Sequence, residues 1–295
     1  MTTYEEFKEL IREKAETEIG GRATIHTMHK NNGVKLDALV IMTMECNISP
    51  SIYLNSFYKE YMECTNREGA LEEIWGEIKQ TYFNNIPNES IDTDCILDFS
   101  RVRGRIHMKI VNREKNKELL EQLAYIPYLD LAIVFTIAMI VEDCEMATIT
   151  VRRDFMETWG VDESELWNIA CENMAEDFEV ISMYKLLEEY NVMAAKNCLD
   201  IDMYVMTNHS RVQGAVTMVQ PGVMCKVAEE LDAEKLIILP CSVHELILLN
   251  ADNKIDTDFL NIKVREVNKN GVLPEEVLSD HVYIYDKESD EVKMA

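Results

Sequence analysis

The stretch Leu236-Ile-Ile-Leu-Pro-Cys-Ser-Val-His-Glu-Leu-Ile-Leu-Leu249 decides the fold class of this chain. Four apolar residues precede its polar centre and four follow it. Apolar runs of this length, separated by a proline and a polar turn, are typical of two buried strands. The centre also carries a thiol, a hydroxyl, an imidazole and a carboxylate, so it is the first place to look for chemistry.

The segments around this stretch do not alternate strictly between strand and helix. We expect further strands at Met203–Met206, Ala215–Val219 and Val282–Tyr285, with helices near Pro221–Leu231 and Asp256–Asn268. Consecutive strands are not typical of a doubly wound parallel sheet. The predicted fold class is therefore α+β, with mixed or antiparallel sheets packed with helices.

The N-terminal part shows the same mixture. Thr3-x-x-Glu6 has the form of a capping box and predicts a first helix that ends at Gly20-Gly21. The turn signal Lys30-Asn-Asn-Gly33 joins two predicted strands, Ala23–Met28 and Lys35–Met44, into a hairpin.

The middle of the chain contains one long apolar run, Tyr128–Val141, which predicts a central strand. Asp130 lies inside this run, so we expect it to need a partner. A strand is also expected at Ala147–Val151, and the pattern from Arg152 to Tyr190 predicts helices. From these changes of pattern we predict an N-terminal α+β domain at 1–151, a helical connector at 152–200 and a C-terminal α+β domain at 201–295.

Composition indicates a chain that stays inside the cell. It has 295 residues, 47% of them apolar, and eight scattered cysteines with no Cys-x-x-Cys pair, as expected of reduced thiols in the cytoplasm. The opening Met1-Thr-Thr-Tyr-Glu-Glu-Phe7 is acidic and amphipathic, so we expect no targeting segment. The run Leu131–Val141 is too short to span a bilayer, and we expect no membrane partner.

The formal charge is −25, which disfavours nucleic acid as a partner because two polyanions repel each other. One basic island, Arg101–Lys117, opposes this trend. It either contacts a phosphate or another polyanion, or complements acidic side chains of the same protein. The second interpretation is favoured. Within the island Asn112 is expected to cap a helix that ends near Leu123.

The candidate catalytic residues are Ser242, His244 and Cys241. A serine or cysteine nucleophile needs a base within hydrogen-bond distance and a third group that orients the base. If Val243 starts the second strand, Ser242 and His244 share one face and Glu245 points to the other. The orienting acid would then have to come from elsewhere, with Asp37, Asp130 and Asp280 as candidates. The favoured interpretation is a polar turn in which His244 bonds to a buried backbone group.

A second candidate site, for a ligand, consists of Asn55, Tyr58 and Tyr61. Their spacing of three residues places them on one face of a helix, where they would line a polar and aromatic groove. The favoured alternative is that Asn55 caps the helix and both tyrosines belong to the core.

No metal or cofactor site is predicted. His26-x-x-His29 lies in a strand pattern that puts the two imidazoles on opposite faces. The acidic stretch Asp252-Asn-Lys-Ile-Asp-Thr-Asp258 lacks the central glycine of a calcium loop and is interpreted as a helix entry. Glycine-rich phosphate loops are not recognisable in the sequence.

Several phrases resemble a family of uncharacterised proteins from anaerobic, gut-associated Clostridia, and the likeness covers nearly the whole chain. They are Leu36-Asp-Ala-Leu-Val40, Ile48-Ser-Pro-Ser-Ile-Tyr-Leu-Asn55, Phe57-Tyr-Lys-Glu-Tyr61, Trp159-Gly-Val-Asp-Glu163, Leu239-Pro-Cys-Ser-Val-His-Glu245 and Leu273-Pro-Glu-Glu-Val-Leu-Ser-Asp280. The resemblance implies no activity. The family usually has Pro-Ser-Ser where this chain has Pro240-Cys-Ser242, which weakens a cysteine-nucleophile hypothesis.

Together these observations predict a cytoplasmic bacterial protein that binds an unknown protein or small-molecule ligand rather than catalysing a reaction. The first alternative is a Ser/Cys-His hydrolase that uses the Cys241–Glu245 turn. The second is an acidic mimic that binds a basic partner. The oligomeric state is not predicted.

Overall fold

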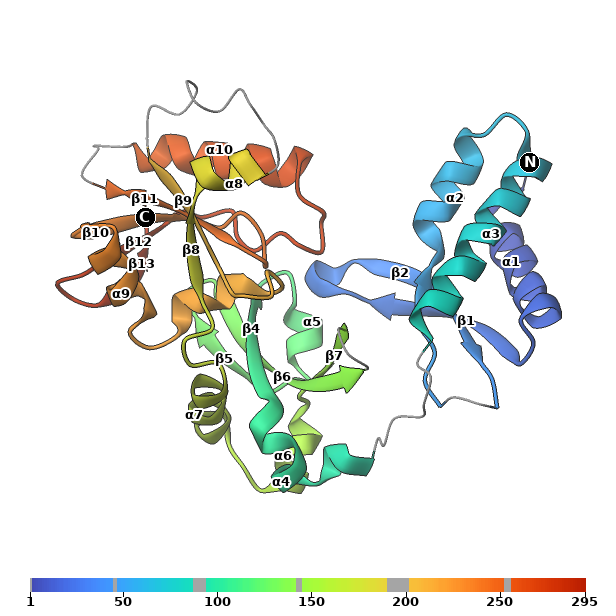
Figure 1. The fold of residues 1–295 in the computed structure, drawn as a ribbon, viewed down its shortest axis with the longest axis horizontal. Helices are drawn as coiled ribbons and strands as arrows, with labels where there is room; N and C mark the ends of the chain where they lie inside the picture. Colours follow the sequence, from blue (N-terminus) through green and yellow to red (C-terminus); the bar gives the residue numbers. More distant parts are fainter. Residues whose placement is uncertain (1, 45–46, 87–93, 142–144, 190–201, 252–255) are drawn as a thin grey trace. The chain divides into compact units, whose positions relative to one another are not determined.

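The two apolar runs around the Cys241–Glu245 turn form an antiparallel pair, β10 (Lys235–Leu239) and β11 (Leu246–Asn250). The chain is described by a computed structural model, which covers residues 2–44, 47–86, 94–141, 145–189, 202–251 and 256–295. Its sheets are built from antiparallel pairs and packed with helices (Figure 1). The predicted α+β class is confirmed.

Contacts between Cα atoms divide the chain into two units, which are described separately. Unit 1 comprises Met1–Lys30, Val34–Cys95 and Ile140–Glu145, and unit 2 comprises Asn31–Gly33, Ile96–Met139 and Met146–Ala295. The domain boundaries expected at residues 151 and 200 stay a prediction.

Unit 1 combines three helices with a small antiparallel sheet. Its elements are α1 (Tyr4–Glu18), β1 (Arg22–His29), β2 (Lys35–Met42), β3 (Ile52–Tyr53), α2 (Leu54–Glu63) and α3 (Arg67–Asn85). The predicted capping box is present, since Thr3 Oγ1 accepts from Glu6 N at 3.2 Å and Thr3 N donates to Glu6 Oε2 at 2.7 Å. Apolar side chains from the three helices and from the sheet form one core, in which Phe7, Ile11 and Ile78 are fully buried.

Unit 2 contains the larger sheet, with strand order β13-β12-β10-β11-β9-β8. The strands not yet given are β8 (Glu179–Ser182), β9 (Met203–Thr207), β12 (Tyr283–Asp286) and β13 (Glu291–Met294), and the helices of this part are α8 (Met183–Glu189), α9 (Val223–Glu230) and α10 (Thr257–Asn270). Val264 of α10 packs against Ile237 and Leu249, so this helix covers one face of the sheet at β10 and β11.

A second sheet of unit 2 has the order β4-β6-β5, with β7 paired to β6. Its strands are β4 (Ile106–Asn112), β5 (Tyr125–Tyr128), β6 (Leu131–Val141) and β7 (Glu145–Thr150), and the short helices are α4 (Phe99–Val102), α5 (Lys117–Leu120), α6 (Arg153–Trp159) and α7 (Glu163–Asn173). Most of the apolar run Tyr128–Val141 forms β6, the middle strand of this sheet, whereas Tyr128 ends β5. Among the described residues, no helix combines the length and the apolar character that a membrane crossing requires.

In unit 2, three local predictions are wrong. The segment Ala215–Val219 is not a strand but part of a fully buried 3₁₀ helix, Gly214–Val219. It lies so close to neighbouring chain that a side chain on Gly214 would meet the His244 carbonyl oxygen at 2.6 Å and the Thr207 hydroxyl. The range Arg152–Tyr190 includes β8 besides its helices.

The third concerns Asn112, which does not cap a helix. It ends β4, its Oδ1 accepts from Lys115 N at 2.9 Å, and the short helix α5 begins later with Asn116 at the cap position. The stretch Asp252–Asp258 lies partly outside the described residues, but Asp256 caps α10 through Asp258 N and Phe259 N.

Candidate functional site

The turn between β10 and β11 is held by hydrogen bonds to its backbone from three other segments. Val243 N donates to Glu276 O at 2.8 Å, and Ala215 N donates to Val243 O at 3.2 Å. Thr207 Oγ1 donates to His244 O at 2.8 Å. The turn is therefore a fixed part of unit 2.

The His244 ring has a defined orientation. Its Nδ1 accepts from Gln213 N at 3.2 Å, and its Nε2 lies 3.6 Å from Glu276 Oε1. Because Nδ1 must offer a lone pair to a backbone N–H, the ring proton belongs on Nε2, on the side of Glu276. Nε2 then has no free lone pair, so neither ring nitrogen is free to take a proton from a nucleophile.

Ser242 and Cys241 are not arranged as nucleophiles. Ser242 Oγ accepts from the backbone N of His244 at 3.0 Å, which is a turn-type bond rather than a bond to the imidazole. Burial, reinforced by the charge of Glu245, raises the pKa of the Cys241 thiol to about 12. A thiol with such a pKa is almost entirely protonated near neutrality and therefore unreactive.

The three aspartates considered as orienting acids are engaged elsewhere. Asp37, in unit 1, accepts from Thr27 Oγ1 at 2.7 Å and from Lys8 Nζ at 3.0 Å. Asp130 accepts from Ser279 and Tyr283, and Asp280 accepts from Asn268. The acid that faces the His244 ring is Glu276, which no sequence pattern singled out.

Asn55, Tyr58 and Tyr61 lie together in unit 1 and serve its internal packing. Asn55 does not cap α2, whose cap residue is Tyr53; instead its Oδ1 accepts from Asp37 N at 2.8 Å. Tyr58 OH donates to Thr2 O, and Tyr61 OH lies 3.1 Å from Thr2 Oγ1. Both rings also pack against Phe7. The three side chains therefore join the start of the chain to α2 and to the sheet.

Unit 2 contains a pocket of about 570 Å³ beside the C-terminal half of α10. Its wall comes from α10, the segment 271–282 that follows it, the turn Asn31–Gly33 and the turn after β4. The lining residues are Asn32, Lys115, Arg265, Asn268, Lys269, Asn270, Val272, Pro274, Val277 and Asp280.

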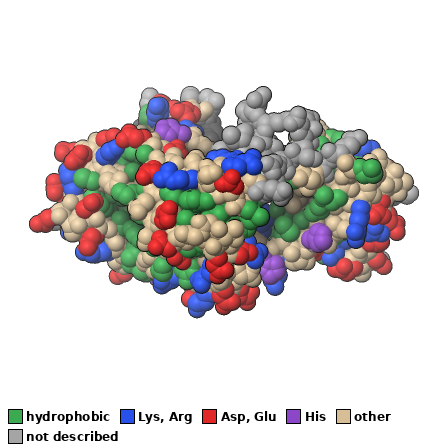
Figure 2. Space-filling view, turned by 90° about the horizontal axis from the view of Figure 1, so that it is seen from below, with side chains coloured by type: hydrophobic (Ala, Val, Ile, Leu, Met, Phe, Trp, Pro, Cys, Tyr) green, Lys and Arg blue, Asp and Glu red, His purple; other side chains and the backbone are tan. Residues whose placement is uncertain are grey.

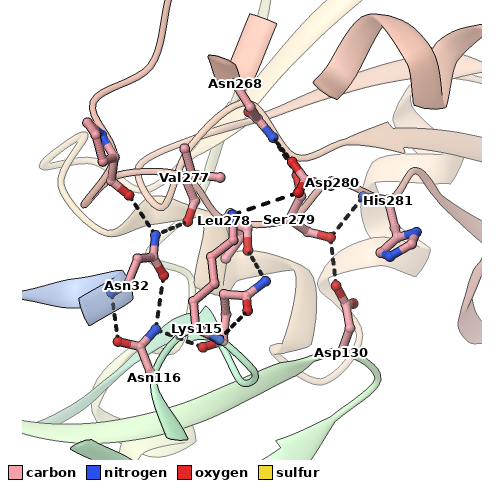
Figure 3. Close-up of polar contacts among 12 residues, drawn as sticks. Asn32, Lys115, Asn116, Asp130, Asn268, Val277, Leu278, Ser279, Asp280 and His281 are labelled. Atoms are coloured by element: carbon pink, nitrogen blue, oxygen red, sulfur yellow. Dashed lines mark hydrogen bonds and ion pairs between the residues drawn. The ribbon is translucent and has the colours of Figure 1, made fainter. Parts of the chain in front are cut away.

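A reciprocal pair of asparagines fixes one wall of this pocket (Figure 3). Asn32 N donates to Asn116 Oδ1 at 2.8 Å, and Asn116 Nδ2 donates to Asn32 Oδ1 at 3.0 Å. Asn32 Nδ2 donates to the carbonyls of Pro274 and Val277. Asn32 has φ 59° and ψ 28°, a left-handed conformation that asparagine tolerates better than most residues.

Two further asparagines hold the segment 271–282 along its length. Asn112 Nδ2 donates to Leu278 O at 3.1 Å. Asn268 Nδ2 donates to Ser279 O at 2.9 Å and to Asp280 Oδ1 at 2.8 Å. Because side-chain amides satisfy backbone carbonyls here, the irregular segment has a fixed path without strand partners.

Asp130 anchors the end of the same segment. It follows β5 and accepts a hydrogen bond from Ser279 Oγ at 2.7 Å (Figure 3). It accepts a second one from Tyr283 OH at 2.7 Å. The expectation that Asp130 needs a partner is confirmed. Burial and the nearby Asp130 charge hold the pKa of Tyr283 well above its ordinary value, so its hydroxyl remains a donor.

The charged side chains of the pocket are mostly basic. Lys115 Nζ lies 3.7 Å from Asp280 Oδ2, which is an ion pair too long for a hydrogen bond. Arg265 and Lys269 project from α10 one turn apart, and within the described residues neither has an ion pair or side-chain hydrogen bond.

The sequence indicated several segments of this site, but it did not predict that they form a pocket. It identified Lys30-Asn-Asn-Gly33 as a turn, Lys115 as part of the basic island and the phrase Leu273–Asp280 as part of a resemblance. It missed Arg265, Lys269 and Asn268, because a helical position gives no sign of which groove it faces. Elsewhere in the island, Arg103 pairs with Glu172 and Lys117 with Glu114, as expected of an internal complement to acidic groups.

In the described part of the chain, no group of three or more His, Cys, Asp or Glu side chains could hold a metal ion. Of the pair in His26-x-x-His29, His26 Nε2 lies 2.9 Å from Thr24 Oγ1 on the exposed strand β1.

Comparison with known proteins assigns the chain to a family, but not to a function. No curated protein and no solved structure matches the chain. A family model described as a family of unknown function (DUF5688) matches residues 4–287. The match covers nearly the whole length of the 295 residues and includes the pocket and the β10–β11 turn. The chain therefore belongs to this family of unknown function.

Proposed function

We propose that this protein acts by binding another molecule, and that the pocket beside α10 receives it. The pocket itself is the observation that carries the proposal: its volume of about 570 Å³ lies within the usual range of small-molecule sites. Its polar wall is already fixed by the bonds of Asn32, Asn116 and Asn268. A preformed wall lowers the entropy that binding costs.

We further propose a cytoplasmic location, on the basis of the eight cysteines without a Cys-x-x-Cys pair. A source among anaerobic, gut-associated Clostridia follows only from the resemblance of the sequence phrases.

A hydrolase is the alternative that has one observation in its favour, since Glu276 lies next to His244 as an orienting acid would. Against it stand the Nδ1 contact with Gln213 N and the backbone contact of Ser242. This alternative would be established if the purified protein hydrolysed esters and the His244→Ala variant lost that activity while retaining the fold.

An acidic mimic has less support. That hypothesis requires a continuous negative face. On the face drawn in Figure 2, acidic and basic side chains of the described residues lie interspersed.

The test blocks the pocket at its exposed rim. Asn270 lies at the C-terminal end of α10, and its Nδ2 donates to Glu266 O one turn earlier, at 3.0 Å. The variant Asn270→Trp should remove binding of fragments that saturation-transfer NMR detects with the original protein.

Asn85→Trp is the matched control, because Asn85 is an exposed residue at the end of α3 that makes the same bond, to Thr81 O at 2.8 Å. The control should bind the fragments like the original protein. If no fragment binds, or if both tryptophan variants bind equally well, the pocket is not the binding site.

A further inference from the structure

We infer that the pocket beside α10 takes a small organic anion whose carboxylate or phosphate group is held by Arg265, Lys269 and Lys115. This inference rests on the proposed function and adds the chemical class of the ligand to it. The two cations of α10 are the first reason. Arg265 and Lys269 are four residues apart, so they lie on the same face of the helix and both line the pocket.

Both cations lack internal partners in the described part of the chain, whose 295-residue sequence holds 54 acidic and only 29 basic residues. Lys269 lies in the last turn of α10, where a cation also offsets the helix dipole. That role does not account for Arg265, which lies a full turn earlier. A guanidinium offers two parallel donors to a carboxylate or phosphate, which makes it the strongest recognition group in this wall.

Lys115 is placed to join them without leaving the Asp280 carboxylate free of hydrogen bonds. Its distance of 3.7 Å from Asp280 Oδ2 makes a loose pair between half-exposed side chains. Asp280 also accepts from Asn268 Nδ2 at 2.8 Å. If Lys115 turns to a bound anion, Asp280 therefore keeps a hydrogen-bond partner.

The local charge opposes the charge of the whole chain. The lining holds three cations, Lys115, Arg265 and Lys269, and one anion, Asp280, so its net charge is 3 − 1 = +2. At physiological salt the field of distant charges is screened beyond about 8 Å. The local charge therefore decides which ligand is attracted, although the whole molecule carries −25.

The remaining wall indicates an apolar body on the ligand. Val272, Pro274 and Val277 line the pocket together with the cations. A bare inorganic ion would leave this apolar surface wet, whereas an organic anion covers it and gains from its burial. The expected ligand therefore combines a short apolar group with one oxyanion.

The experiment titrates the full chain with four probes that share a phenyl group: phenyl phosphate, phenylacetate, phenethyl alcohol and phenethylamine. Calorimetry should show binding of the phosphate, of the carboxylate or of both, with the amine excluded. Arg265→Gln should weaken binding of the anions at least tenfold, and added NaCl should weaken it further. The comparison of the two anions shows which oxyanion the pocket prefers.

Lys263→Gln is the control, because it removes one positive charge from the same helix at a residue that pairs with Glu266 and does not line the pocket. Equal weakening by both variants would reduce the effect to general charge and overturn the inference. The inference would also be overturned if the alcohol or the amine bound and the anions did not. If Asn270→Trp removed that binding, the proposed function would still stand. Failure of all four probes and of the fragment screen would remove both.

Discussion

The contacts of the His244 ring and the pKa of the Cys241 thiol bear on whether the β10–β11 turn could catalyse a reaction. The His244 ring accepts a backbone N–H at Nδ1, and Cys241 has its pKa raised by burial. In a working nucleophile-base pair the base has a free lone pair and the thiol is partly ionised. Both residues show the opposite arrangement, which favours the binding proposal over the hydrolase alternative.

Cys241 should therefore react slowly with alkylating agents. At pH 8 a thiol of pKa about 12 is ionised roughly three orders of magnitude less than one near the ordinary 8.5. Mass-spectrometric mapping after iodoacetamide should find Cys241 labelled more slowly than Cys64 and Cys225. In denaturant the difference should vanish. Rapid labelling of Cys241 in the folded protein would contradict the burial described here.

Asn32 should be important for the stability of unit 2. Asn32→Ala removes the bonds that Nδ2 donates to Pro274 O and Val277 O and the bond that Oδ1 accepts from Asn116 Nδ2. It also places a less suitable residue at φ 59°. The expected loss in the free energy of unfolding is about 2–4 kcal/mol, from the bonds and the conformation together.

Asn32→Gly tolerates the same backbone and loses only the side-chain bonds, so its loss should be smaller than that of Asn32→Ala. Asn85→Ala, which removes one exposed bond, should change stability by less than about 0.5 kcal/mol. Urea unfolding followed by circular dichroism measures all three. Equal stability of the Ala variant and the original protein would show that the asparagine pair contributes nothing.

At the scale of elements, polar side chains join segments that the apolar core alone would leave unaligned. In unit 1, Asp37 of β2 accepts hydrogen bonds from Thr27 of the facing strand β1 and from Lys8 of α1. In unit 2, the asparagines and Asp130 do the same for the segment 271–282. A one-residue shift in either place would leave partly buried polar groups without partners, so these bonds select the register.

The Asp37 contact should make unit 1 sensitive to acid. The hydroxyl of Thr27 and then the ammonium of Lys8 lower the pKa of Asp37. A carboxyl with a lowered folded-state pKa stabilises the fold above its unfolded-state pKa, and this stabilisation disappears as the pH falls through the folded-state value. Asp37→Asn should therefore lower the melting temperature at pH 7 and make less difference at about pH 3, near and below the ordinary pKa of about 3.9.

Asp258→Asn, at the exposed first turn of α10, is the comparison for Asp37→Asn. It should change the melting temperature at pH 7 less than Asp37→Asn does, because Asp258 makes no side-chain ion pair within the described residues. A constant difference between Asp37→Asn and the original protein across this range would mean that the carboxylate charge is not what stabilises the contact.

For the molecule as a whole, we expect charge repulsion to be the dominant electrostatic effect. The chain carries −25, while several of its ion pairs, such as Arg103–Glu172 and Lys263–Glu266, join side chains that are about half exposed or more. Exposed pairs of this kind contribute little each. The repulsion among the excess acidic groups is spread over the surface and opposes the compact state.

Moderate salt should therefore stabilise the protein. Raising NaCl from about 20 to about 200 mM at pH 7 shortens the screening length and should raise the melting temperature by about 2–4 °C. The gain should be smaller at pH 5, where part of the carboxylates is neutral. Differential scanning calorimetry measures both. A lower melting temperature in salt would show that the ion pairs outweigh the repulsion.

The sequence alone determined those parts of the fold that depend on local pattern. The capping box at Thr3 and Glu6, the hairpin turn at Lys30-Asn-Asn-Gly33 and the apolar runs of β6, β10 and β11 carry their own signals, because caps, turns and periodic burial involve neighbouring residues. The preference for a polar turn over a triad at Cys241–Glu245 rested on the same local geometry.

The tertiary structure decided what depends on residues distant in the sequence. The run Ala215–Val219 is apolar in a strand and in a buried 3₁₀ helix alike, and only its packing against Thr207 and His244 makes it the helix. The pocket brings together Asn32, Lys115 and Arg265 from segments up to 233 positions apart (265 − 32). No local sequence pattern predicts that these residues lie together, because their positions depend on how the whole chain buries its apolar faces and pairs its polar groups.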